Sequence, residues 1–195
     1  MKAFNGYDDA KESAKHSGGG RLPAGAYVCK ILGVKETPPK DGKSGFLTVQ
    51  FDIAEGEQKD FFKNQYEANE REDKKFKGKT TIYQPKDDGS DKDAWTKNTF
   101  AKWTNALEES NKGYTWDWDE KKWKDKLIGI VFGDTGTRIN GNDIVYTEAR
   151  YPVSVEKVRA GEAGTAKFKA KGDYGKDSSD DFMNIPDDAG EELPF

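Results

Sequence analysis

Two stretches of alternating residues decide the fold: GAYVCKILGVKE at residues 25–36 and FLTVQFDIAEG at residues 46–56. In the first, one face of a strand carries Tyr27, Cys29 and Ile31, and the other carries Val28, Lys30 and Leu32. In the second, the apolar face carries Leu47, Val49, Phe51 and Ile53, and the opposite face carries Phe46, Thr48 and Gln50. A period of two, with a turn-rich segment between the stretches, predicts an antiparallel pair with one solvated face.

Further strands are predicted on the C-terminal side of this pair, at TTIYQP (80–85), KLIGIVFG (126–133) and RINGNDIVYTEARYPVSVEKV (138–158). Asn140 and Gly141 favour a hairpin turn within the last of them. Residues 60–79 are charged with sparse aromatic residues, which fits either a short helix running into a basic loop or a mobile insertion.

The best helix lies at residues 87–113, where one stripe carries Phe100, Trp103 and Leu107. We expect Asp93 to cap its start, and Asn111 and Gly113 to end it. We therefore predict a mainly β fold with one main helix, and specifically a five-stranded OB-fold-like barrel with elaborated loops. A β-sandwich is the alternative fold that this pattern also fits.

Composition limits the chain to one main domain with polar appendages. Of 195 residues, 33% are apolar and 35% are charged, and the mean hydropathy is −0.99, so some segments are not expected to join the core. Aromatic residues still reach 12%, more than a small core requires. We assign residues 1–20 to a flexible arm, 21–160 to the folded domain and 161–195 to a disordered acidic tail.

The charge is distributed unevenly. Seven of the 36 acidic residues follow Lys176, where no Lys or Arg occurs, so the net charge of −4 divides into +3 for residues 1–176 and −7 for the rest. The sequence pI of about 5.3 therefore hides a mildly basic body.

Catalysis is not expected. The single histidine, His16, lies in the glycine-rich arm, and the single cysteine, Cys29, lies at mid-strand among apolar neighbours. No spacing typical of a metal or phosphate-binding site occurs, so we expect no catalytic residue, metal or cofactor. One cysteine excludes an intramolecular disulfide, and neither a membrane span nor a secretion signal is evident, which favours the cytoplasm and no membrane partner.

Lysine interleaved with aromatic residues is the main functional signal, at KKFKGK (74–79) and YTWDWDEKKWKDK (114–126). Cations that follow phosphates and rings that stack on bases are how proteins hold single strands. Candidate residues are Lys30, Lys35, Lys43, Phe46, Lys74, Lys75, Phe76, Lys77, Lys79, Tyr83, Lys122 and Trp123, and Lys40 would extend the groove. Trp116 and Trp118 alternate with aspartates that would repel phosphate, so they either pack under the barrel or form a sugar-binding platform.

The last residues, EELPF (191–195), are not explained by solubility, which gains nothing from a terminal Leu-Pro-Phe. A terminal phenylalanine offers a ring and an α-carboxylate that a basic-rimmed apolar pocket can capture together. We therefore predict that the tail binds partner proteins through Asp187, Asp188, Glu191, Glu192, Leu193, Pro194 and Phe195. The tail would also be attracted to the protein's own basic groove and compete with an anionic ligand.

The chain resembles bacterial and bacteriophage single-stranded DNA-binding proteins, whose OB-fold body carries a disordered acidic tail ending in Ile-Pro-Phe. The resemblance rests on about sixteen residues: the acidic run at Asp180, Asp181, Asp187 and Asp188, and the end at Pro194 and Phe195, with Leu193 in place of isoleucine. It implies a protein that protects single-stranded DNA and recruits replication, recombination and repair enzymes. The lysine-rich insertion and short linker point to a phage-encoded relative, acting in the host cytoplasm.

Three alternatives stay open: a protein-binding adaptor that touches no nucleic acid, a carbohydrate-binding β-sandwich, and a nuclease with carboxylate-held Mg²⁺. The sequence leaves open whether the protein forms a homo-oligomer, whether it prefers DNA or RNA, and how many nucleotides it covers.

Overall fold

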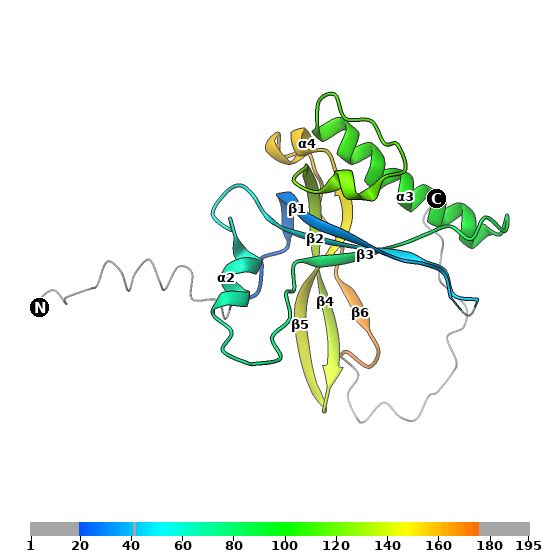
Figure 1. Cartoon of the computed structure of the whole chain (residues 1–195). Coiled ribbons are helices and arrows are strands. Elements are labelled where there is room, and N and C mark those ends of the chain that lie inside the picture. Colours follow the sequence, from blue (N-terminus) through cyan, green and yellow to red (C-terminus); the bar gives the residue numbers. More distant parts are fainter. Residues whose placement is uncertain (1–19, 41, 176–195) are drawn as a thin grey trace, which may run out of the picture.

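A six-stranded mixed sheet forms the centre of the computed structural model, which describes residues 20–40 and 42–175 (Figure 1). Five antiparallel strands lie in the order β3-β2-β1-β4-β5. They are β1 (Gly25–Thr37), β2 (Phe46–Ile53), β3 (Lys79–Tyr83), β4 (Leu127–Ile139) and β5 (Asn142–Val153). The short β6 (Lys169–Lys171) pairs in parallel with β4. β6 lies inside the range 161–195 that the sequence assigns to the tail.

The helical elements are α2 (Phe61–Glu67), α3 (Asp91–Ser110), α4 (Val155–Arg159) and a 3₁₀ turn, η1 (Glu120–Trp123). α3 contacts β3, β4, β5 and α4, whereas α2 contacts β2. Figure 1 shows α3 and α4 together at one end of the sheet and α2 set apart from them. The predicted mainly β fold with one main helix is confirmed. No helix within 20–40 and 42–175 is long and apolar enough to cross a membrane.

The strand pairings among the described residues do not close a barrel. β3 pairs only with β2, and β5 pairs only with β4, so these two strands end the order. The expected five-stranded barrel is therefore not confirmed, although the strands that would form it are present.

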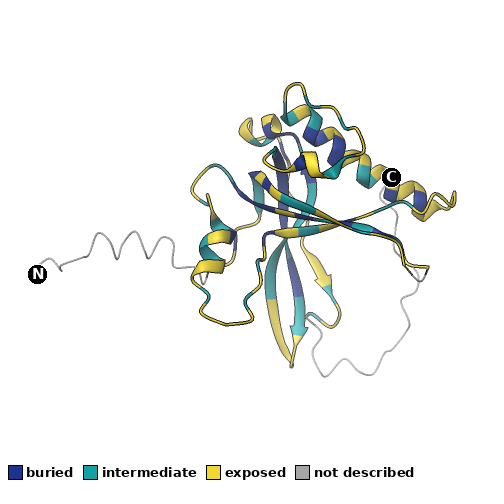
Figure 2. Ribbon diagram, in the orientation of Figure 1, coloured by how far each residue is buried: buried dark blue, intermediate teal, exposed yellow. Residues whose placement is uncertain are grey.

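The core lies between the inner face of the sheet and α3. The four apolar residues predicted for β2 are all buried: Leu47, Val49, Phe51 and Ile53. β4 adds Ile128, Ile130 and Phe132, and α3 adds Trp103 and Leu107. Ring centroids of Phe51 and Phe132 lie 5.9 Å apart in an edge-to-face arrangement that aromatic pairs prefer. Figure 2 shows buried residues along β1, β2 and β4, and on the side of α3 that faces the sheet.

A β-bulge interrupts β1. Ile31 pairs with Phe51 and Gly33 pairs with Gln50, so Leu32 is an extra residue without a partner in β2. Ile31 is completely buried, Leu32 is 42% exposed, and Val34 packs against the core. Since side chains alternate with a period of two, the extra residue reverses which positions of β1 face inward.

The ends of α3 are fixed by hydrogen bonds. Ser90 is the N-cap, and its hydroxyl accepts from the backbone N–H of Asp93 at 3.2 Å. The prediction that Asp93 caps the helix is wrong, because its carboxylate instead accepts from the N–H of Asp87 and pairs with Lys97. At the other end the C-cap Asn111, as predicted, donates from Nδ2 to the carbonyls of Leu107 and Leu127.

The turn between β4 and β5 lies at Asn140 and Gly141, as predicted. Both have positive φ, 52° and 78°, which a two-residue turn of this kind requires.

Candidate nucleic-acid interface

The solvated side of β1, β2 and β3 brings several of the predicted residues together. The strand register forms rows of paired residues that run from β3 through β2 to β1. Three alternate rows are Tyr83, Phe46 and Thr37; Thr81, Thr48 and Lys35; and Lys79, Gln50 and Gly33. We call these nine residues the outer face. All are exposed or half-buried, and directly paired residues project to the same side of a sheet. Lys35, Phe46, Lys79 and Tyr83 therefore share one surface.

Aromatic rings lie at one end of the outer face. Tyr83 is 56% exposed, and its ring meets the half-buried ring of Phe46 edge-on at 6.1 Å. More than half of the surface of Tyr83 is therefore open to solvent, and the contact with Phe46 holds its ring in an arrangement that aromatic pairs prefer. Thr81 and Thr37 beside them were missed by sequence reasoning, although the alternation in KTTIY would have placed Thr81 between Lys79 and Tyr83.

The lysines differ in how far their charge is already neutralised. Within the described part of the chain, Lys35 and Lys79 are exposed and form no ion pair. Lys30, also exposed, pairs with Asp125 at 2.8 Å, and its hydrogen bond to that carboxylate lowers the pKa of Asp125. Lys35 and Lys79 are therefore the better candidates for contact with an anion.

The segment between α2 and β3 carries the predicted lysine cluster. Arg71, Lys75 and Lys77 line a pocket of about 390 Å³ together with Tyr66. The Nζ of Lys74 lies 4.7 Å from the centroid of the Tyr66 ring, a cation–π contact. Lys77 lies two residues before Lys79, the first residue of β3 and a member of the outer face. This basic pocket therefore adjoins the outer face.

The aromatic partner in that cluster differs from the predicted one. Phe76 is half-buried and packs on the core, with its ring 6.4 Å from Phe62 and 6.2 Å from Tyr66. Tyr66 is 37% exposed and offers more of its ring to solvent. The sequence does not single out Tyr66, because the pattern of residues 60–79 does not show which aromatic side chains of this segment are buried in the core.

The assignment of Trp123 as a stacking residue is wrong. Its side chain is completely buried, and its ring lies 5.3 Å from Trp116 and 6.3 Å from Phe100. The 3₁₀ turn η1 directs it into the core, so it has no free face for a base. Its neighbour Lys122 is exposed and pairs with Asp117, which raises the pKa of the lysine and lowers that of the aspartate.

The first-hairpin lysines Lys40 and Lys43 lie in the loop between β1 and β2, both exposed, where the N–H of Lys43 donates to the carbonyl of Lys40 at 2.9 Å. This loop joins the ends of β1 and β2 that carry Thr37 and Phe46. The predicted tail residues from Asp187 to Phe195, and His16, lie outside the described residues.

Two buried ionisable groups, the thiol of Cys29 and the carboxylate of Asp52, take part in packing and in helix capping. Burial raises the pKa of the Cys29 thiol, and the charge of Asp52 raises it further, so the cysteine is a packed hydrophobe, not a thiolate. The carboxylate of Asp52 accepts from the N–H groups of Ile53, Phe62 and Lys63 at 2.8, 3.0 and 2.9 Å. Burial raises the pKa of Asp52, against the effect of these hydrogen bonds. Asp52 thus caps α2 from β2.

No cluster of three or more His, Cys, Asp or Glu side chains suited to a metal ion is found within residues 20–40 and 42–175. The chain matches no protein-family model, and no curated protein matches it at the significance required. Its function must therefore be inferred from its own residues.

Proposed function

We propose that this protein binds single-stranded DNA, with little dependence on base sequence, on the outer face and the adjoining basic pocket. One observation carries the proposal: the register of three strands gathers two exposed cations without an ion pair among the described residues and an exposed ring on a surface whose residues are all exposed or half-buried. Lysines that release counterions from phosphates supply affinity without reading sequence. Tyr83, and Tyr66 at the basic pocket, are the rings that stack on bases.

The strand order supports an OB-like architecture for this function. An OB-fold is a partly open five-stranded barrel that binds oligonucleotides on its strand 2 and 3 face and through the loops that join strands 1–2 and 4–5. In this chain the strands of matching number, β2 and β3, form the outer face together with part of β1, and the β1–β2 loop with Lys40 and Lys43 lies at one end of that face. We propose that β1 to β5 form such a partly open barrel.

Stacking on Tyr83 requires a base whose face is exposed, which favours a single strand over a duplex. The acidic residues after Lys176 would compete with DNA for the same lysines, and a bound strand would release them. We propose that the released tail recruits replication, recombination or repair enzymes through residues 187–195, in the cytoplasm of the cell that contains the protein.

The test is fluorescence anisotropy of a labelled oligo-dT and of a duplex of equal length, titrated with the full chain and with Tyr83→Ala. Stacking is worth about 1–3 kcal/mol per base, so the variant should bind oligo-dT roughly 5- to 150-fold more weakly. Trp95→Ala is the matched control, because Trp95 is 57% exposed but lies on α3 and is not part of the outer face. Equal affinity of Tyr83→Ala and the parent protein would refute the assignment of this face.

A protein-binding adaptor is the principal rival. Deleting residues 187–195 separates the two functions: a DNA-binding protein should bind oligo-dT as well as before or more tightly, and lose its partners. An adaptor would show no DNA binding with or without these residues.

A further inference from the structure

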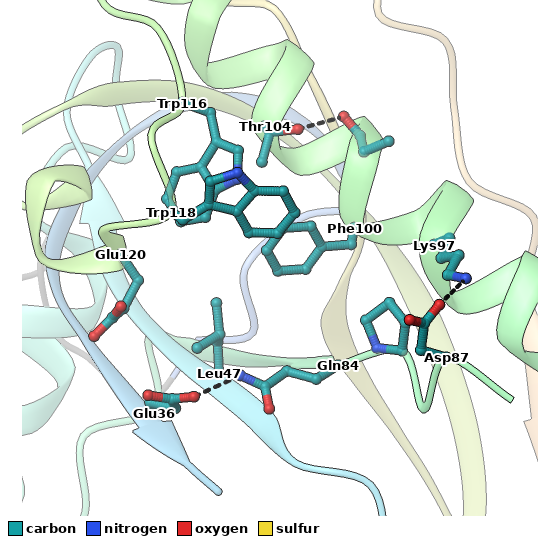
Figure 3. Close-up of a pocket in the computed structure, with 12 residues that line it drawn as sticks. Glu36, Leu47, Gln84, Asp87, Lys97, Phe100, Thr104, Trp116, Trp118 and Glu120 are labelled. Carbon is teal, nitrogen blue, oxygen red and sulfur yellow. Dashed lines mark hydrogen bonds and ion pairs between the residues drawn. The ribbon is translucent and has the colours of Figure 1, made fainter.

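A second hollow lies on the inner side of the same sheet. A groove of about 720 Å³ opens between the ends of β1 and β2, the middle of α3 and residues 114–120 (Figure 3). Leu47, Phe100 and Trp116 supply much of its apolar wall, and Trp118 stands over it. We call it the acid-rimmed groove. Its volume suits several side chains of a ligand.

Trp118 is the least expected residue of this groove. Its side chain is 82% exposed, and its backbone has a φ of 66°, a left-handed conformation that bulky residues rarely adopt. Strained residues of this kind cluster at ligand sites, and exposed tryptophans are common at the centres of interfaces. The ring lies 5.9 Å from Trp116, which in turn contacts the buried Trp123. The core thus supports an indole presented to solvent.

The charge around the groove is negative. Glu36, Asp87 and Glu120 contribute three carboxylates. The single cation of the lining, Lys97, is held between two carboxylates, at 2.5 Å from Asp87 and 2.9 Å from Asp93. A phosphate backbone would be repelled here, and so would the acidic residues that follow Lys176. A cation with an apolar body is the complementary ligand.

We propose that the acid-rimmed groove binds a segment of a partner protein in which Arg or Lys side chains stand beside apolar ones. The cation stacks on Trp118, where a guanidinium fits best, and reaches Glu36 or Glu120. The apolar side chains enter between Leu47 and Phe100.

Occupation of the groove leaves the outer face free. Glu36 and Leu47 are paired across β1 and β2 on the inner side, while the adjacent pairs, Lys35 with Thr48 and Thr37 with Phe46, project to the outer side. The protein can therefore hold a nucleic acid on one side of this sheet and a cationic partner on the other. This inference does not depend on the proposed DNA binding.

The test uses three pools of immobilised heptapeptides with apolar residues at alternate positions and Arg/Lys, Ser/Gln or Asp/Glu at the others. Retention of the full-length protein is measured by biolayer interferometry at low and high salt. We expect the basic pool to retain it at least tenfold better than the other two, with retention falling as salt rises. Trp118→Gly should weaken this about 3- to 30-fold while relieving the positive φ, so the variant should still fold. Glu36→Gln/Glu120→Gln should weaken it too, and Trp95→Ala should not.

Three results would overturn the proposal. Equal retention of Trp118→Gly and the parent protein would mean that the acidic residues after Lys176 hold the basic peptides. Preference for the neutral or acidic pool would exclude a cationic ligand. Failure of the basic pool together with Trp118-dependent binding of chitohexaose or oligo-dT would make the groove a sugar or nucleic-acid site.

Discussion

The salt dependence of binding tests whether the outer face contacts phosphates. Replacing Lys35 and Lys79 with Gln removes two exposed cations without an ion pair among the described residues. Each phosphate contact to a single strand contributes about 0.7 to the slope of log Kobs against log[salt], so the double variant should have a slope smaller by about 1.4. Between 50 and 200 mM NaCl, parent affinity should then fall about sevenfold more than variant affinity.

The assay is anisotropy of a labelled oligo-dT at several salt concentrations, with thermal unfolding used to show that each variant is folded. Lys122→Gln is the matched control, because Lys122 is exposed but already pairs with Asp117. An unchanged slope in the double variant, or an equal decrease in Lys122→Gln, would refute the assignment of the outer face as the path of the phosphates.

Three further predictions concern stability. Asp52→Ala leaves three backbone N–H groups without their acceptor, and should lower the free energy of unfolding in urea by roughly 2–4 kcal/mol while hydrogen exchange of the Phe62 and Lys63 amides accelerates; unchanged exchange would contradict the capping role. Asp93→Asn should lower the free energy of unfolding near neutral pH but not in strong acid. The hydrogen bond from Lys97 lowers the pKa of Asp93 in the folded protein. The stabilisation by this carboxylate is therefore fully present above the ordinary pKa of 3.8 and is lost as the pH falls through the pKa of the folded protein. Unfolding curves of this variant and the parent should therefore converge below pH 3.8, and a constant difference would rule this out. Leu107→Ala opens a cavity at a completely buried site and should cost about 2–5 kcal/mol in urea unfolding, against less than about 0.5 kcal/mol for Leu32→Ala, and similar losses in both would contradict the burial.

The sheet was largely predictable because alternation records burial directly. The inward residues of β2 and the turn at Asn140 and Gly141 are confirmed, since each depends on neighbours within a few positions. The start of α3 was misplaced by three residues because Ser90 and Asp93 both offer a suitable oxygen, and the surrounding contacts decide between them. Whether a sheet closes into a barrel depends on contacts between strands that are distant in the sequence, and a local residue pattern does not record those contacts.

The candidate site was predicted in part. Lys35, Phe46, Lys79 and Tyr83 lie on one face because the alternation that buries Leu47 and Val49 necessarily exposes their neighbours. Trp123 was misassigned because the charged residues around it mask its burial, and a 3₁₀ turn has no period long enough to reveal an inner side. The exposure of Trp118 and its left-handed backbone could not be inferred from residue type, which disfavours both.

The bulge at Leu32 sorts charge between two surfaces. Beyond it, Lys35 belongs to the outer face and Glu36 to the acid-rimmed groove, whereas an uninterrupted strand would continue the inward series of Cys29 and Ile31 through Lys35. Pairing Leu32 with Gln50 in place of Gly33 would close the bulge and exchange the two charges without altering either side chain, taking a cation from one surface and an anion from the other. Deleting Leu32 would instead leave both charges where they are, because Gly33 would then follow Ile31 in unbroken alternation. A one-residue slip of this register therefore reaches an electrostatic inversion that would otherwise require two coordinated substitutions, so the register of β1 is as much a determinant of ligand choice as its composition.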